Sequence, residues 1–250
     1  MFTLLKNLFF KNIGMRQIII KNVFWLTLAE VVIGVAKIGL IIVIIRILGA
    51  AEYGEYAFAF SFVSAIVIFS DLGIIDFSTR EFSRNKEKEK EFPKIFSLYL
   101  LLGILGLALM LMGSFFITQS PEIRKIIFVL AFFVLISNFF NIFYSFLRSR
   151  QKMEYEAGIK IVQALFSFIS VLVIVLYFRS ALGLSYGYLF SNVVALIFLL
   201  GFFHFYISPI KLAWDKSIFK IIRASWPLSL GFVTSWVYLD TGSIMLGYFN

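Results

Sequence analysis

Four ionisable side chains lie deep inside long apolar runs of the sequence, at Glu30, Lys37, Asp71 and Asp240. Runs of this kind cross membranes, and a charge in hydrocarbon is unfavourable unless it faces water or a protein interior, so each residue is a candidate for substrate binding or ion coupling. Glu30 and Lys37 are seven residues apart, nearly two helical turns, and share one face of a helix. This spacing predicts a polar stripe that a hydrated substrate could follow.

Glu30 and Lys37 could each also have a purely structural role. Lys37 lies roughly 21 Å along the helix from Val23 at 1.5 Å per residue, so it faces a cavity or snorkels a long way to the outer surface. The cavity position is favoured. Glu30 either lines the same cavity or pairs with a basic residue of another helix.

Asp71 is, with Glu30, a candidate for ion coupling. Carboxylates in a medium of low dielectric tend to retain a proton or to attract a cation. Asp71 also begins the sequence Asp-Leu-Gly, where its side chain could cap a local break of the helix beside Gly73. The sequence favours the cap.

Asp240 stands 14 residues after Trp226, as Lys37 stands 14 residues after Val23. If the chain restarts its topology at Trp226, as transporters built from parallel repeats do, Lys37 and Asp240 lie at equal depth on two sides of a central cleft. We take this as a hypothesis, because direct similarity between the two segments is weak.

The composition is that of an integral membrane protein. Hydrophobic residues make up 61% of the 250 residues and charged residues 15%, with a mean hydropathy of +0.94. In soluble domains about half of the residues are apolar and about a quarter are charged. The apolar runs do not alternate as barrel strands do, which predicts helices. Cysteine is absent and the single histidine, His204, stands near a span end, so we expect no catalytic residue, no metal site and no cofactor.

Seven apolar runs reach the roughly 20 residues that a helix needs to cross about 30 Å of hydrocarbon. They are Val23–Ile45, Tyr56–Phe77, Ile95–Ile117, Ile126–Leu147, Ile159–Phe178, Leu182–Ile207 and Trp226–Phe249. The prediction is an all-α polytopic membrane protein with four parts: a basic N-terminal segment (1–22), a six-helix transmembrane lobe (23–207), an interfacial connector helix (208–225) and the first helix of a second lobe (226–250).

The basic residues predict the orientation of the chain. Eighteen of the 23 Lys and Arg residues lie on the side that carries the N-terminus, and four lie on the other side. Basic loops are retained in the cytoplasm, so the N-terminus is predicted to be cytoplasmic. The net charge of +9 then faces the anionic lipids of the inner leaflet, and nucleic acid is not required as a partner.

Short motifs follow one another along the whole chain. In order they are Arg46-Ile-Leu-Gly49, Tyr53-Gly54-x-Tyr56, Asp71-x-Gly73, Arg80-Glu81, Arg148-x-Arg150-Gln151-Lys152-Met153, Trp226-Pro227 and Leu246-Gly247-Tyr248-Phe249. Their order and spacing resemble the polysaccharide-exporter flippases, the Wzx-like branch of the multidrug/oligosaccharidyl-lipid/polysaccharide transporter superfamily.

This resemblance implies two six-helix bundles that form a V and move a lipid-linked oligosaccharide across the cytoplasmic membrane by alternating access. The partner implied is an oligosaccharide on an undecaprenyl- or dolichyl-diphosphate carrier. Its diphosphate would bind cationic cavity residues, with Lys37 best placed and Arg46 at the outer mouth. The chain would correspond to the first lobe and the opening helix of the second.

Other functions stay open beside this one. A cation-coupled multidrug antiporter of the same superfamily would use Glu30 and Asp71 for ion coupling, and a membrane fragment without transport activity is a further alternative. An enzyme is disfavoured, because the loops are too short for a soluble catalytic domain.

Overall fold

The computed structural model describes residues 14–206, 212–215 and 218–229, and this part of the chain is helical and contains no strand. Its elements are α2 (Met15–Asp71), α3 (Ile74–Arg84), the 3₁₀ helix η1 (Lys86–Glu91), α4 (Phe92–Ile117), α5 (Pro121–Ser149), α6 (Met153–Phe178), α7 (Ala181–Tyr206) and a helix over 218–229. Five helices in the described part are long and apolar enough to cross a membrane. The predicted all-α membrane fold is confirmed; most of the predicted seventh span, with Asp240, lies outside the described residues.

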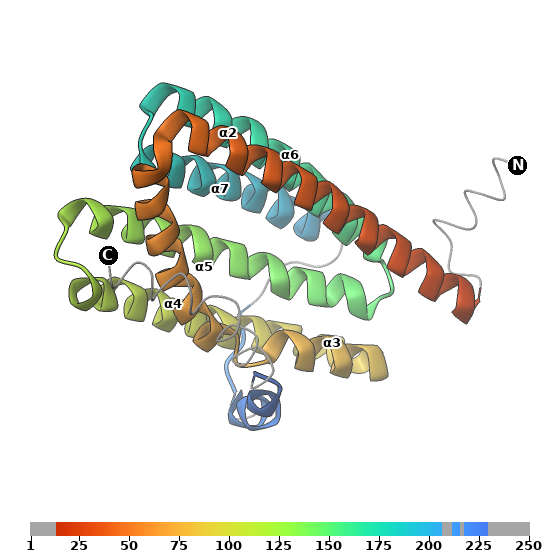
Figure 1. Ribbon diagram of the computed structural model, residues 1–250. Helices are drawn as coiled ribbons and strands as arrows, with labels where there is room; N and C mark the ends of the chain where they lie inside the picture. Colours follow the sequence, from red (N-terminus) through yellow and green to blue (C-terminus); the bar gives the residue numbers. More distant parts are fainter. Residues whose placement is uncertain (1–13, 207–211, 216–217, 230–250) are drawn as a thin grey trace, which may run out of the picture.

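The first two predicted spans form one element, the 57-residue α2, which breaks at Gly49. Gly49 has φ 80° and ψ 171°, a conformation that residues with a side chain rarely adopt. At this point the chain turns back in Figure 1, so α2 comprises two membrane segments. The first segment begins at Met15, before the predicted Val23, and takes in the end of the basic N-terminal segment.

The second segment of α2 ends at Asp71, before the predicted Phe77. Leu72 and Gly73 take the left-handed backbone conformation, with φ of 46° and 71°, and this interrupts the right-handed helix. A Cβ atom at Gly73 would lie 2.5 Å from the carbonyl oxygen of Ser225. Two independent reasons therefore favour glycine at position 73: the positive φ of its backbone, and the close approach of the helix over 218–229. The break redirects the chain into the amphipathic α3.

The charged stretch after α3 forms η1, in which lysine and glutamate residues alternate. Lys88 donates to Glu81 and lowers the pKa of that carboxyl. Arg150, in the turn after α5, donates to Glu89 over 2.6 Å. These pairs hold the segment against the rest of the lobe at the end predicted to be cytoplasmic.

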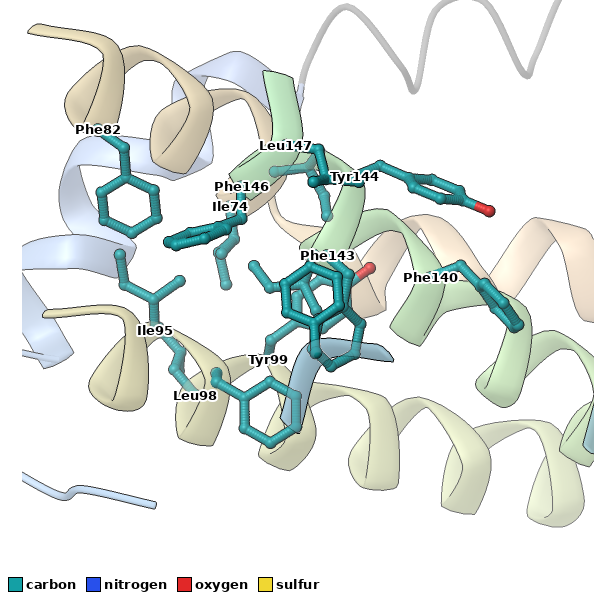
Figure 2. Packing of buried hydrophobic residues seen from close by; sticks show 14 of the residues in the cluster. Ile74, Phe82, Ile95, Leu98, Tyr99, Phe140, Phe143, Tyr144, Phe146 and Leu147 are labelled. Atoms are coloured by element: carbon teal, nitrogen blue, oxygen red, sulfur yellow. The ribbon is translucent and has the colours of Figure 1, made fainter. Parts of the chain in front are cut away.

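The middle of the lobe is α5, which packs against α2, α3, α4, α6 and α7. One of the two core clusters is a group of aromatic rings from α3, α4, α5 and α7, seen in part in Figure 2. The rings of Phe143 and Phe203 lie 4.4 Å apart, and those of Phe92 and Phe146 lie 5.2 Å apart. Lipid tails are as apolar as these side chains, so helices gain little from burying apolar surface against one another in a membrane. Close packing between aromatic rings supplies an attraction of its own between the helices.

The helix over 218–229 also contacts this cluster. Ile218 and Ile221 are buried in it, while Lys220 and Arg223 are exposed. This is the amphipathic pattern expected of an interfacial connector. The helix continues through Trp226, where the sequence analysis placed the start of the next span.

Replacing Gly73 by Ala is expected to destabilise the lobe by about 2 kcal/mol, because it adds strain at positive φ and a clash with Ser225. The matched control is Gly54→Ala, since a Cβ atom there meets nothing within 4 Å and helix propensity favours Ala. Thermal unfolding in detergent, followed by tryptophan fluorescence, should show a lower midpoint for Gly73→Ala alone. Equal midpoints for the two variants would contradict the role given to Gly73.

Candidate functional site

Lys37 lines a cavity of about 420 Å³ inside the lobe, which we call the Lys37 cavity. Its walls come from both segments of α2 and from α5, α6 and α7. Its lining is Ile33, Ala36, Lys37, Leu40, Ile41, Ile44, Tyr53, Tyr56, Ala57, Phe60, Ser61, Phe133, Ala164, Ser167, Phe168 and Tyr188. Lys37 is the one charged residue in this set. Lys37 therefore lines a cavity, the position that the sequence favours, while its side chain is exposed; its role in binding stays a prediction.

Aromatic rings form one wall of the Lys37 cavity. Tyr56 stacks on Tyr188 with ring centroids 5.8 Å apart and on Phe60 at 6.0 Å, and Phe133 lies 5.6 Å from Tyr188. The spacing of the Tyr53-Gly-x-Tyr56 motif, nearly one helical turn, turns both phenols toward the cavity. The wall offers flat apolar faces together with hydroxyl groups.

A second cavity of about 420 Å³, which we call the Glu30 cavity, adjoins the first. The two share Ile33, Phe133, Ala164, Ser167 and Tyr188 in their linings. The remaining lining of the Glu30 cavity is mostly polar: Glu30, Ser137, Phe140, Asn141, Tyr144, Lys160, Gln163 and Asn192. Glu30 and Lys37 thus line two adjoining cavities, together called the hollow, that share part of their walls.

Hydrogen bonds fix the amide side chains of the Glu30 cavity. Tyr144 Oη donates to Gln163 Oε1 over 3.3 Å, Gln163 Nε2 donates to Asn192 Oδ1 over 2.9 Å, and Asn192 Nδ2 donates to Ser137 Oγ over 2.5 Å. The chain of bonds crosses from α5 through α6 to α7. It holds amide and hydroxyl groups in place at the cavity wall, where they satisfy one another within the lobe.

Glu30 has a partner on another helix, which was the second interpretation of this residue. Lys160 of α6 donates to Glu30 Oε1 over 3.0 Å and lies 3.2 Å from Glu156 Oε1. Arg148 of α5 donates twice to Glu156, over 2.6 and 2.8 Å. Four charges therefore form a chain that joins α2, α6 and α5.

Lys160, Glu156 and Arg148 were not among the predicted site residues. Arg148 and Glu156 lie between the predicted fourth and fifth spans, and Lys160, at the start of the fifth, was counted with the same loop. In the structure α5 extends to Ser149 and α6 begins at Met153. The signal that could have found them is the spacing of Glu156 and Lys160, which at i and i+4 can pair on one face of a helix.

A further group of contacts ties the start of α2 to the turn between α5 and α6. Lys21 pairs with Glu154 over 2.9 Å and donates to the carbonyl oxygen of Gln151 over 3.2 Å. Asn22 Nδ2 donates to Gln151 Oε1 over 2.6 Å. The turn that carries the Arg148-x-Arg150-Gln151 motif is thus a docking point for α2.

The other predicted site residues lie elsewhere. Asp71 Oδ1 accepts a hydrogen bond from the backbone nitrogen of Ile75 over 3.2 Å, so the cap interpretation is confirmed, and Asp71 lines neither cavity. Arg46 is exposed near the end of the first segment of α2 and lines neither cavity either. Asp240 lies outside the described residues. Within the described part, no cluster of His, Cys, Asp and Glu side chains could hold a metal ion.

A sequence model of the family described as polysaccharide biosynthesis protein matches residues 19–250. The chain belongs to this family. The resemblance to polysaccharide-exporter flippases is thereby confirmed, and the family indicates a membrane transporter rather than an enzyme. No curated protein matches the chain.

Solved transporters of the MOP superfamily share the fold. An outward-facing multidrug resistance transporter of the MATE family aligns with a TM-score of 0.57 at 15% identity, over 84% of this chain and 52% of that chain. A transporter from Pyrococcus furiosus aligns with a TM-score of 0.50 at 16% identity, over 88% of this chain and 51% of that one. The chain thus spans about half the length of these transporters and has the fold of that part of a multi-pass membrane transporter.

The ion pair between Arg148 and Glu156 should contribute more to the stability of the lobe than the ion pair between Arg150 and Glu89. Glu156 is wholly buried, so replacing Arg148 by Met leaves a buried charge short of its main partner and should cost about 3 kcal/mol. Arg150→Met, which breaks a more exposed pair with Glu89, should cost about 1 kcal/mol. Thermal midpoints of the purified variants test this order, and a reversed order would contradict it.

Proposed function

We propose that the chain is the N-terminal part of an exporter that moves a lipid-linked oligosaccharide across the cytoplasmic membrane by alternating access. The substrate class is an oligosaccharide joined through diphosphate to a long isoprenoid lipid. The observation that carries this proposal is the position of Lys37, a single cation in an aromatic cavity that opens into an amide-rich one.

Lys37 suits the diphosphate. Among the described residues it has no hydrogen-bond or ion-pair partner, although it lies well inside the first membrane segment of α2. The side chain of Lys37 is exposed within the lobe, but a cation at this depth of a membrane is unfavourable unless it meets water or a counter-ion, and an anionic ligand in the cavity would supply one. An ammonium group donates strong hydrogen bonds to phosphate oxygens.

The rest of the hollow suits sugars. The rings of Tyr188 and Phe133, which are partly exposed, present flat faces on which the apolar face of a sugar ring can rest. Asn141, which lines the Glu30 cavity and is exposed, provides an amide group that both donates and accepts hydrogen bonds, which is what sugar hydroxyls require.

An apolar groove of about 510 Å³ between α6 and α7 suits the lipid. Its lining is Glu154, Tyr155, Gly158, Ile159, Val162, Gln163, Phe166, Val194, Ala195, Phe198, Leu199 and Phe202. Gln163 lines this groove and also the Glu30 cavity. A molecule with a polar head and a hydrocarbon tail could therefore occupy the cavity and the groove together.

A cation-coupled multidrug antiporter is the second candidate, favoured by the shared fold with a multidrug resistance transporter. Its ion site would use Glu30 and Asp71. Glu30 is paired with Lys160 and Asp71 caps α3, so these carboxylates serve separate structural contacts and the exporter is preferred.

Deleting the gene in its own host and restoring it in full length tests the exporter. Lys37→Ala should lower surface polysaccharide at least tenfold at unchanged protein level, because the cavity loses its cation, and Asp240→Ala tests the predicted partner across the cleft. The matched control is Lys125→Ala, since Lys125 is exposed at the start of α5 and lines neither cavity.

Normal export by Lys37→Ala would overturn the role of Lys37. If the deletion leaves surface polysaccharide intact but sensitises the cells to drugs, and the restored gene reverses this, the antiporter replaces the exporter. Because the host supplies its own sugars, a mismatch of substrate does not confuse either result.

A further inference from the structure

We infer that Lys160 is a second anion-binding residue of the hollow, and that Glu30 occupies it until the phosphate groups of a ligand displace the Glu30 carboxylate. The inference rests on the proposed function in taking the ligand to be a diphosphate. It assigns Lys160 a role in binding, and Glu30 the role of a built-in competitor.

The charges along the chain of ion pairs show which member can leave. Glu156 is 0% exposed and receives two hydrogen bonds from Arg148, so these two charges balance each other. Lys160 is then balanced by Glu30, over 3.0 Å. The side chain of Glu30 is 64% exposed and has Lys160 as its one ion-pair partner in the described part of the chain.

Lys160 stays in place when Glu30 leaves. Its ammonium group remains 3.2 Å from Glu156 and lies 5.5 Å from the centre of the Tyr144 ring, on the wall of the Glu30 cavity. Its side chain is 20% exposed, so the group is held by its surroundings and still reaches the cavity. Removal of Glu30 thus leaves an oriented cation with one unmatched positive charge.

A diphosphate is a stronger competitor for this cation than Glu30. Phosphate oxygens accept the same hydrogen bonds as a carboxylate, but a diphosphate carries more than one negative charge. An acidic sugar offers a single carboxylate, the same chemistry as Glu30, and should compete poorly.

The position of Lys160 gives the hollow two cations in series. Glu30, which contacts Lys160, lies about 10 Å along the helix axis from Lys37 on the same face of α2. Lys160 faces the end of the hollow predicted to be cytoplasmic, and Lys37 lies further in. A diphosphate entering from the cytoplasm would meet Lys160 first.

Binding of inorganic pyrophosphate to the complete protein in phosphatidylcholine nanodiscs, measured by calorimetry, tests this inference. Glu30→Gln keeps the shape of the side chain and removes its charge, and it should tighten binding by at least threefold. Lys160→Gln should weaken binding by a similar factor, and Lys160→Arg should keep it. The matched control is Glu122→Gln, an exposed carboxylate at the start of α5 that lines neither cavity.

The double variant Glu30→Gln/Lys160→Gln separates a local effect from a general change of charge. It should bind as Lys160→Gln alone, because Glu30 acts only through Lys160. The inference is overturned if Glu30→Gln leaves binding unchanged or weakens it, if the gain persists without Lys160, or if glucuronate binds as tightly as pyrophosphate. Export by Lys37→Ala is measured separately, so failure of the proposed function and failure of this inference give different results.

Discussion

The buried ion pair between Arg148 and Glu156 is the contact on which the rest of the lobe depends. It joins α5 to α6, and through Lys160 and Glu30 the same chain of charges reaches α2. These helices provide most of the walls of the two cavities. Hydrocarbon gives helices little reason to associate, so polar contacts inside the lobe determine which faces meet.

Two breaks in the backbone give these contacts their geometry. Gly49 turns the chain back so that both segments of α2 line the Lys37 cavity, and Gly73 ends the second segment and begins α3, which packs against α5. Both glycines have positive φ. Membrane helices tolerate such breaks where neighbouring groups satisfy the backbone, as Asp71 does for Ile75.

The hollow lies within the first lobe, with walls from α2, α5, α6 and α7. Under the proposed function a polar head group would therefore contact residues of this one lobe. Under the proposed function the apolar groove between α6 and α7 gives the lipid a place beside the same hollow, with Gln163 at the boundary. The structure thus places three neighbouring environments, two cavities and one apolar groove, beside one another.

The sequence by itself determined the features that depend on local chemistry. Run lengths predicted the membrane helices, because hydrocarbon thickness sets a minimum length, and the helical period placed Glu30 and Lys37 on one face. Tertiary structure decided which side chains meet them. Lys160 is 130 residues from Glu30, so no local spacing along the chain could predict that these two side chains pair. The role of Asp71 was likewise decided by the backbone break that it caps, which separates it from the cavities that Glu30 and Lys37 line.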